Sequence, residues 1–138
     1  MERKTQISRV AAAVLGLGLA VSALVQLVAP LPWYEATPGV VATGPFNPHF
    51  VRDIGVAYLT AAGGLIAFAW KPRAAWPALV AAAAFLVLHA AIHVFDALCG
   101  ARPLQDTLRD LAGVHLVALI TLGLALACDP KSASQGAI

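Results

Sequence analysis

Four long apolar segments dominate the chain and predict four helices. They lie at about residues 8–29, 48–70, 74–99 and 107–128, and stretches that are polar or rich in proline and glycine separate them. A helix needs about 20 apolar residues to cross the hydrocarbon core of a bilayer, which is ~30 Å thick. All four segments reach this length. We therefore expect an all-α fold, an integral membrane four-helix bundle that makes one transmembrane domain of residues 1–138.

The composition agrees with a membrane protein. Hydrophobic residues make up 60% of the chain and charged residues only 12%, whereas soluble domains carry about 25% charged residues. The net charge of +2 is small, and no basic patch with interleaved aromatic residues is visible, so nucleic acid is not an expected partner. The expected partners are the lipid bilayer and, through faces of small residues, other membrane subunits or a second copy of the chain.

The first apolar segment has the alternative interpretation of a signal peptide. Val21-Ser22-Ala23 resembles a cleavage site. However, the apolar run over residues 10–29 is about twice as long as the apolar core of a signal peptide. We therefore expect this segment to be retained as the first helix.

The connection between the first two segments is the longest, and proline and glycine recur in it from Pro30 to Pro48. Such a sequence disfavours a long regular helix, so we expect a long loop on the outer side. Asn47 followed by Pro48 favours the start of the second helix, because Asn caps helices and Pro suits the first helical position. Thr107-x-x-Asp110 resembles a capping box, in which Asp110 serves only as a cap.

The basic residues predict the orientation of the bundle. If the helices alternate in direction, six basic residues lie on one side, and these are Arg3, Lys4, Arg9, Lys71, Arg73 and Lys131. Three lie on the other side, and these are Arg52, Arg102 and Arg109. Because cytoplasmic loops carry the excess of Lys and Arg, we expect both termini in the cytoplasm. Five of the seven acidic residues then belong to the outer half.

Ionisable residues interrupt the apolar third segment, which reads AAAAFLVLHAAIHVFDALCG over residues 81–100. On a helix, His89, His93 and Asp96 share one narrow stripe. Ionisable groups inside a spanning helix are costly and by default mark a functional site. His115 in the fourth segment lies at a similar depth, about 12 Å inside. The three histidines are therefore expected to meet in the outer half of the bundle.

These side chains are typical of a transition-metal site. Neutral imidazole together with carboxylate suits copper, zinc or iron, and an acidic mouth attracts cations. The candidate ligands are His89, His93, Asp96 and His115, followed by His49 and Asp53 at the start of the second helix. Three further residues are expected to orient the ligands or to gate the site, and these are Arg52, Arg109 and Glu35. The predicted function is metal handling or redox chemistry at a site that faces the outer side.

Three other functions stay open. A b-type haem could bind with His89 or His93 and with His115 as axial ligands. The protein could instead be a non-enzymatic accessory subunit of a larger membrane complex, in which the histidines serve packing or proton transfer. A small transporter ranks last, because four helices are few for a carrier and no inverted repeat is visible.

No complete catalytic set accompanies the histidines. The sequence lacks a glycine-rich phosphate loop and a serine nucleophile elbow. Cys99 and Cys128 end the third and fourth segments, which places them on opposite sides of the bilayer, so they cannot form a disulfide with each other. An enzymatic activity therefore does not follow from the sequence.

The stretch GPFNPHFVRDIGVAYL, followed by a histidine-bearing third helix, resembles small bacterial four-helix membrane proteins of the DoxX-like kind. The resemblance covers most of residues 11–127 in hydropathy, and its specific parts are residues 47–59 and 89–96. It implies the four-helix fold and a multi-pass location in the bacterial inner membrane. Some DoxX-like proteins are associated with quinone-linked or thiol redox systems. Cys99 and Cys128 do not form a CxxC pair, so a thiol-redox role is not expected here.

Overall fold

The computed structural model describes residues 2–100 and 104–130, and within these two ranges it contains helices and no strand. The all-α prediction is therefore confirmed. The elements in chain order are α1 (Glu2–Val28), α2 (Pro30–Ala36), the 3-10 helix η1 (Val41–Thr43), α3 (Pro48–Trp70), α4 (Trp76–Leu98), α5 (Leu104–Arg109), the π-helix η2 (Leu111–His115) and α6 (Leu116–Ala127).

Three of these helices are long and apolar enough to cross a membrane. They are Thr5–Val28 within α1, the whole of α3 and the whole of α4. Their outward surfaces are apolar, and Leu17, Val21 and Leu88 are examples of side chains that are more than half exposed. Exposed apolar surface of this extent fits contact with lipid rather than with water.

The fourth predicted segment is not one long helix. It is divided into α5, η2 and α6, and its continuous apolar part covers Leu111–Ala127, which is shorter than the three long helices. In η2 the N–H of His115 approaches the carbonyl oxygen of Asp110 at 3.4 Å, across five residues. Such π-helical turns are rare and often occur at functional sites.

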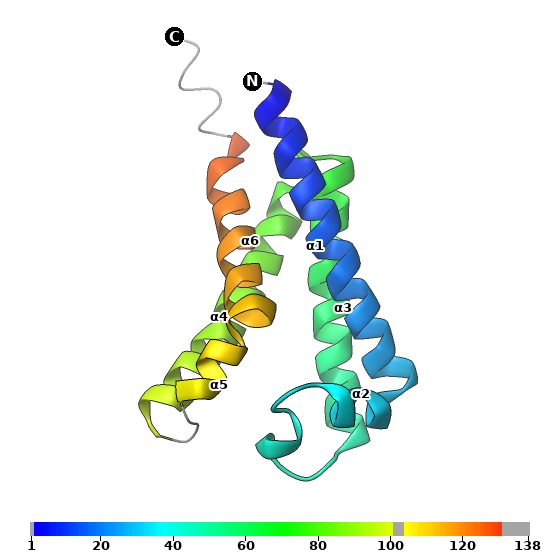
Figure 1. Cartoon of the computed structure of the whole chain (residues 1–138). Helices are drawn as coiled ribbons and strands as arrows, with labels where there is room; N and C mark the ends of the chain where they lie inside the picture. The colour runs from blue at the N-terminus through cyan, green and yellow to red at the C-terminus, as the bar shows by residue number, and fades with distance from the viewer. Residues whose placement is uncertain (1, 101–103, 131–138) are drawn as a thin grey trace.

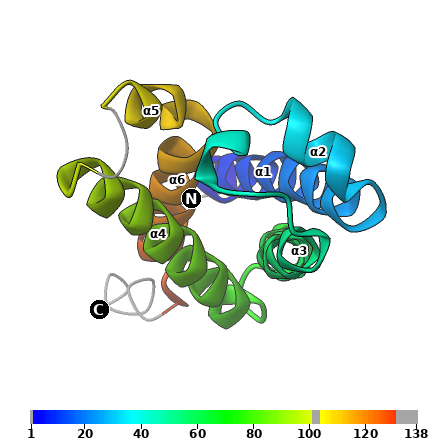
Figure 2. The same ribbon diagram turned by 90° about the horizontal axis from the view of Figure 1, so that it is seen from below.

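The three long helices and α6 pack in the order α1, α3, α4, α6, whereas α1 and α6 touch each other little. α1 begins and α6 ends at the same end of the bundle, and α2 and α5 lie at the opposite end (Figure 1). Figure 2 shows the bundle from the end that carries α2 and α5. The candidate site described below lies at this end.

Small residues allow the long helices to approach closely. A Cβ atom on Gly64 of α3 would lie 2.6 Å from the carbonyl oxygen of Ala78 in α4, and one on Gly16 of α1 would lie 2.8 Å from Cγ1 of Ile66. The core that these contacts enclose contains Leu65, Phe68 and Leu79, among other side chains. In lipid, such close packing replaces the hydrophobic effect as the force that holds helices together.

The predicted loop between α1 and α3 contains the short elements α2 and η1. The hydroxyl of Tyr34 donates a hydrogen bond of 2.6 Å to the carbonyl oxygen of Gly44 and thereby closes this segment on itself. The start of α3 is as predicted, because the side chain of Asn47 accepts hydrogen bonds from the backbone N–H groups of His49 and Phe50. The segment therefore returns to α3 in a defined conformation.

Candidate functional site

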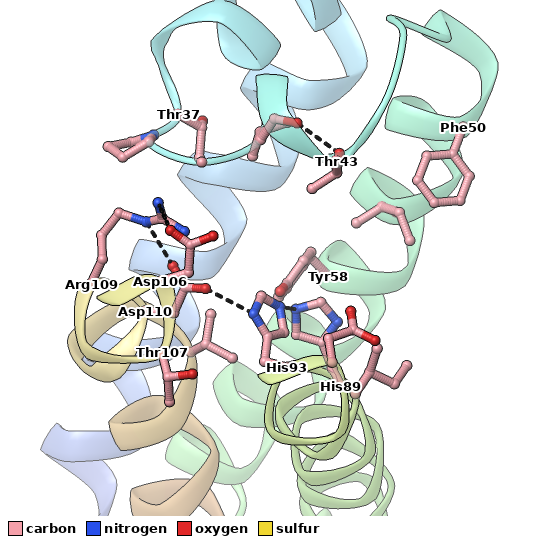
Figure 3. A pocket seen from close by; sticks show the side chains of 17 residues that line it. Thr37, Thr43, Phe50, Tyr58, His89, His93, Asp106, Thr107, Arg109 and Asp110 are labelled. Carbon is pink, nitrogen blue, oxygen red and sulfur yellow. Dashed lines mark hydrogen bonds and ion pairs between the residues drawn. The ribbon is translucent and has the colours of Figure 1, made fainter. Parts of the chain in front are cut away.

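A chain of hydrogen bonds joins a carboxylate to two histidines at the end of the bundle that carries α5. Oδ2 of Asp110 lies 2.9 Å from Nδ1 of His93, and Nε2 of His93 lies 3.3 Å from Nε2 of His89. Figure 3 shows the three side chains in line across the space between α5 and α4. We call Asp110, His93 and His89 the histidine relay.

Local structure explains how these residues meet. His89 and His93 are one turn apart on α4, so their rings lie on the same face, with ring centroids 4.9 Å apart. Asp110 lies directly between α5 and η2. Its carboxylate is 15% exposed and the side chain of His93 is 30% exposed, so the pair is partly shielded from solvent.

The order of donors and acceptors along the relay follows from Asp110. An ionised carboxylate only accepts hydrogen bonds, so Nδ1 of His93 carries a proton and donates to Asp110. A neutral His93 then has a lone pair on Nε2, and Nε2 of His89 donates to it. This arrangement leaves Nδ1 of His89 as a proton acceptor. The relay therefore presents a base at the end that is remote from the carboxylate.

Arg109 holds the carboxylate end of the relay. Its Nη1 donates to Oδ1 of Asp106 at 2.7 Å, and its Nε donates to Oδ1 of Asp110 at 3.1 Å. The guanidinium also lies against Gly39, where it occupies the space that a Cβ atom would need. Arg109 thus connects α5 with the segment between α2 and α3.

Electrostatics keep Asp110 ionised. Burial acts to raise the pKa of its carboxyl, but the hydrogen bonds from Arg109 and His93 and the charge of Arg109 outweigh burial and hold the pKa below its usual range. The hydrogen bond to Asp110 is likewise the main cause that raises the pKa of Arg109. The acceptor at the head of the relay is therefore charged at neutral pH.

The relay borders a pocket of about 450 Å³, which we call the relay pocket. Its apolar walls include Phe50, Ile54, Ile92 and Val114, and its polar walls include both histidines of the relay, Asp96, Asp106 and Arg109. Tyr58 of α3 packs edge-on against His89 with ring centroids 5.5 Å apart. A mostly apolar cavity with a few convergent polar groups is the usual form of a small-molecule site.

His115 lies beside the relay but does not join it through a hydrogen bond. Its ring is 6.2 Å from that of His93, nearly perpendicular to it. Its Nε2 atom is buried and has no hydrogen-bond partner within the described part of the chain. The three histidines predicted to meet therefore do so through ring contacts, and His93 lies between His89 and His115.

The other predicted site residues lie in three places. Asp96 lines the relay pocket. His49 and Asp53 pair with each other at 3.4 Å on the surface of α3, where their side chains are 87% and 61% exposed, and they do not line the pocket. Nε of Arg52 donates to the carbonyl oxygen of Leu27.

Glu35 is exposed on α2, outside the relay pocket. Of the three residues expected to orient ligands or to gate the site, Arg109 is therefore the one that contacts the relay. No group of three or more His, Cys, Asp or Glu side chains has the geometry to hold a metal ion in residues 2–100 and 104–130.

The sequence analysis missed the role of Asp110. The capping box predicted from Thr107 and Asp110 is wrong, because α5 begins earlier, at Leu104. The Asp110 side chain makes no cap hydrogen bond and binds His93 and Arg109 instead. The sequence did contain a signal for this role, because the oppositely charged neighbours Arg109 and Asp110 directly precede an apolar segment that carries His115.

Comparisons with family models, with curated proteins and with solved structures found no match for this chain. The resemblance to DoxX-like proteins stays a prediction. The functional argument therefore rests on the relay and its pocket.

Proposed function

We propose that the protein is a multi-pass membrane protein that binds a small hydroxylated molecule in the relay pocket and accepts a proton from it through the histidine relay. The observation that carries the proposal is the hydrogen-bonded series from Asp110 through His93 to His89 at the wall of a mostly apolar pocket. The series orders the protons so that Nδ1 of His89 is an acceptor.

The chemistry is that of an oriented base. The ligand's O–H bond breaks, its proton goes to Nδ1 of His89, and the proton on Nε2 of His89 passes to Nε2 of His93 across the 3.3 Å contact. The imidazolium formed at His93 is stabilised by the carboxylate of Asp110 at 2.9 Å. A carboxylate that orients and stabilises a histidine in this way is a recurring device of acid–base sites.

The location follows from the predicted topology. We propose that Leu111–Ala127 crosses the bilayer together with the three longer helices, that both termini are cytoplasmic, and that the relay pocket faces the outer side. The excess of basic residues at the end with the termini supports this orientation. The bacterial inner membrane is the proposed compartment.

4-Nitrophenol tests the proposal, because it is a small phenol whose ionised form is coloured. We would titrate it into the protein in phosphatidylcholine nanodiscs at a pH where most of the free phenol is protonated. Binding next to a base raises the ionised fraction, so the absorbance of the phenolate is expected to rise saturably above that of empty nanodiscs. Replacement of His89 by Ala is expected to abolish this increase.

Two carboxylate variants sharpen this test. Asp110→Asn removes the charge that stabilises His93, and we expect it to lower the bound phenolate at least tenfold. Asp53→Asn removes an exposed carboxylate outside the pocket and is expected to leave the titration unchanged. A phenolate signal that is equal in wild type, His89→Ala and Asp110→Asn would overturn the proposal.

A transition-metal site is the second candidate, and the 3.3 Å separation of the two Nε2 atoms favours it. Two nitrogen ligands at ~2.0–2.1 Å from a tetrahedral metal ion lie at about this separation. Asp110 would then orient His93 through Nδ1, as carboxylates commonly do for metal-bound histidine. The remaining ligands of copper, zinc or iron would come from water, from a bound molecule or from a displaced side chain such as Asp96 or His115.

Elemental analysis and an absorption spectrum of protein purified without chelators test the second candidate. About one metal ion per chain that is lost in His93→Ala but kept in His49→Ala would support it, because His49 is exposed and lies outside the pocket. A Soret band would instead establish the b-type haem. Metal content that is negligible, or equal in the two variants, would contradict a metal site at the relay.

A further inference from the structure

A second cavity of about 480 Å³ adjoins the relay pocket. It lies where α1 faces η2 and α6, which are helices that touch each other little. We call it the α1–α6 crevice. The two cavities share six wall residues, and these are Thr37, Pro38, Tyr58, Arg109, Asp110 and Val114. They are therefore neighbouring parts of one larger space.

The walls of the two cavities differ in chemistry. Beyond the shared residues, the crevice is lined by Val14, Leu15, Gly18, Leu19, Ser22, Gly113 and Val117, none of which is charged. The relay pocket carries the histidines, Asp96 and Asp106. The histidines and most of the charged groups thus lie in the relay pocket, whose other walls are apolar, and this pocket continues into a space along α1 where the remaining walls are uncharged.

We propose that the ligand of the relay pocket is a single-chain amphiphile whose hydroxylated head contacts the relay and whose apolar chain lies in the α1–α6 crevice. This inference rests on the proposed function and specifies its ligand. Ser22 and Val14 are eight residues apart, so the crevice follows about 12 Å of helix. A space of about 480 Å³ along this stretch of helix has room for an alkyl chain.

The crevice accommodates the chain rather than attracting it. Lipid tails are as apolar as leucine side chains, so a hydrocarbon chain gains little when it leaves the bilayer for the crevice. The head group provides the specific contacts near Arg109 and Asp110, and the part of the crevice between α1 and Val117 offers the attached chain uncharged walls. The location of the chain is therefore a better readout than a gain in affinity.

Gly18 offers a direct way to fill the crevice. A Cβ atom on Gly18 meets nothing within 4 Å, so a larger side chain enters open space. Gly63 of α3 is the matched control, because its Cβ position is equally free and it lines neither cavity. Replacing either glycine by leucine improves helix propensity, so neither variant is expected to unfold the protein.

The experiment uses 4-dodecylphenol with a photoreactive diazirine at the end of its chain, in phosphatidylcholine nanodiscs. Mass spectrometry locates the labelled residues. We expect labels on Val14, Leu15, Leu19 and Val117 that excess 4-dodecylphenol suppresses. Gly18→Leu is expected to lower this labelling at least fivefold, Gly18→Ala to have a smaller effect, and Gly63→Leu to have none.

Labels that spread over lipid-facing residues such as Val10 and Val21, without competition, would overturn the inference. Equal crevice labelling in wild type and Gly18→Leu would do the same. The 4-nitrophenol titration separates this inference from the proposed function, since that probe has no chain. A normal titration with dispersed labels refutes the crevice alone, whereas a titration without phenolate formation refutes the proposed function as well.

Discussion

The carboxylate of Asp110 has two partners on different elements, Arg109 beside it in the chain and His93 on α4. It therefore fixes the position of α5 relative to α4 and at the same time sets the proton on His93. A single residue in this position links the stability of the site to its acid–base chemistry.

Acid should remove the contribution of Asp110 to stability. Because its pKa is lower in the folded protein than in the unfolded chain, the contribution is complete above the ordinary aspartate pKa of about 3.9 and is lost as the pH falls below it. Thermal unfolding in detergent is expected to be steady near neutral pH and to shift to lower temperature in acid. Asp110→Asn should reduce this fall of the unfolding temperature in acid. A fall of the same size as in wild type would contradict the role of Asp110.

Gly39 tests the contact between Arg109 and the segment that follows α2. Its φ angle is +82°, and the Arg109 guanidinium occupies the position of a Cβ atom. Gly39→Ala therefore adds a steric conflict to a backbone cost of about 1–2 kcal/mol. Gly100 has a comparable φ angle of +70° but open space around its Cβ position, so Gly100→Ala is the control, measured by denaturant unfolding. Equal losses in the two variants would show that the Arg109 contact is unimportant.

At the scale of the elements, the closest approach of α3 to α4 depends on Gly64. A methyl group there meets the carbonyl oxygen of Ala78 at 2.6 Å and Cβ of Ala82 at 3.3 Å, so the helices must separate. We expect Gly64→Ala to destabilise the protein by about 1–3 kcal/mol in unfolding by sodium dodecyl sulfate. Gly63→Ala, one residue away in open space, should be neutral or stabilising. A Gly64→Ala variant as stable as wild type would contradict the packing.

The elements differed in how well the sequence predicted them. The long helices were predictable because apolar length and the Asn47-Pro48 start are local signals. The division of the fourth segment into α5, η2 and α6 was not, because a π-helical turn has no simple signature in hydrophobic periodicity. The same turn follows Asp110 directly. Because a π-helical turn changes the number of residues per turn, helical spacing could not predict which way the Asp110 side chain points.

At the scale of the candidate site, the stripe of His89, His93 and Asp96 was predictable from helical spacing alone. Their partners were not, because the contact of His93 with Asp110 depends on how α5 packs against α4. His49 and Asp53 were grouped with the site by depth, but their side chains pair on the surface of α3. Depth in the bilayer does not determine the direction in which a side chain points.

For the whole molecule, the two cysteines report the topology. Cys99 follows α4 at the end that carries the relay, and Cys128 follows α6 at the end that carries the start of α1. Both are free thiols. In intact cells, a membrane-impermeant maleimide is expected to label Cys99 in Cys128→Ala and to spare Cys128 in Cys99→Ala until the membrane is permeabilised. Labelling in the reverse pattern would place the relay on the cytoplasmic side.

The histidine relay is the central claim, and nitrogen-15 NMR of the histidine rings in nanodiscs measures it most directly. In wild type at neutral pH we expect His93 to carry its proton on Nδ1 and His89 on Nε2, as the contacts with Asp110 and with each other require. Asp110→Asn should change the tautomer or the protonation of both rings, while Asp53→Asn leaves them unchanged. Wild-type rings with the opposite tautomers, or rings that do not respond to Asp110→Asn, would contradict the relay.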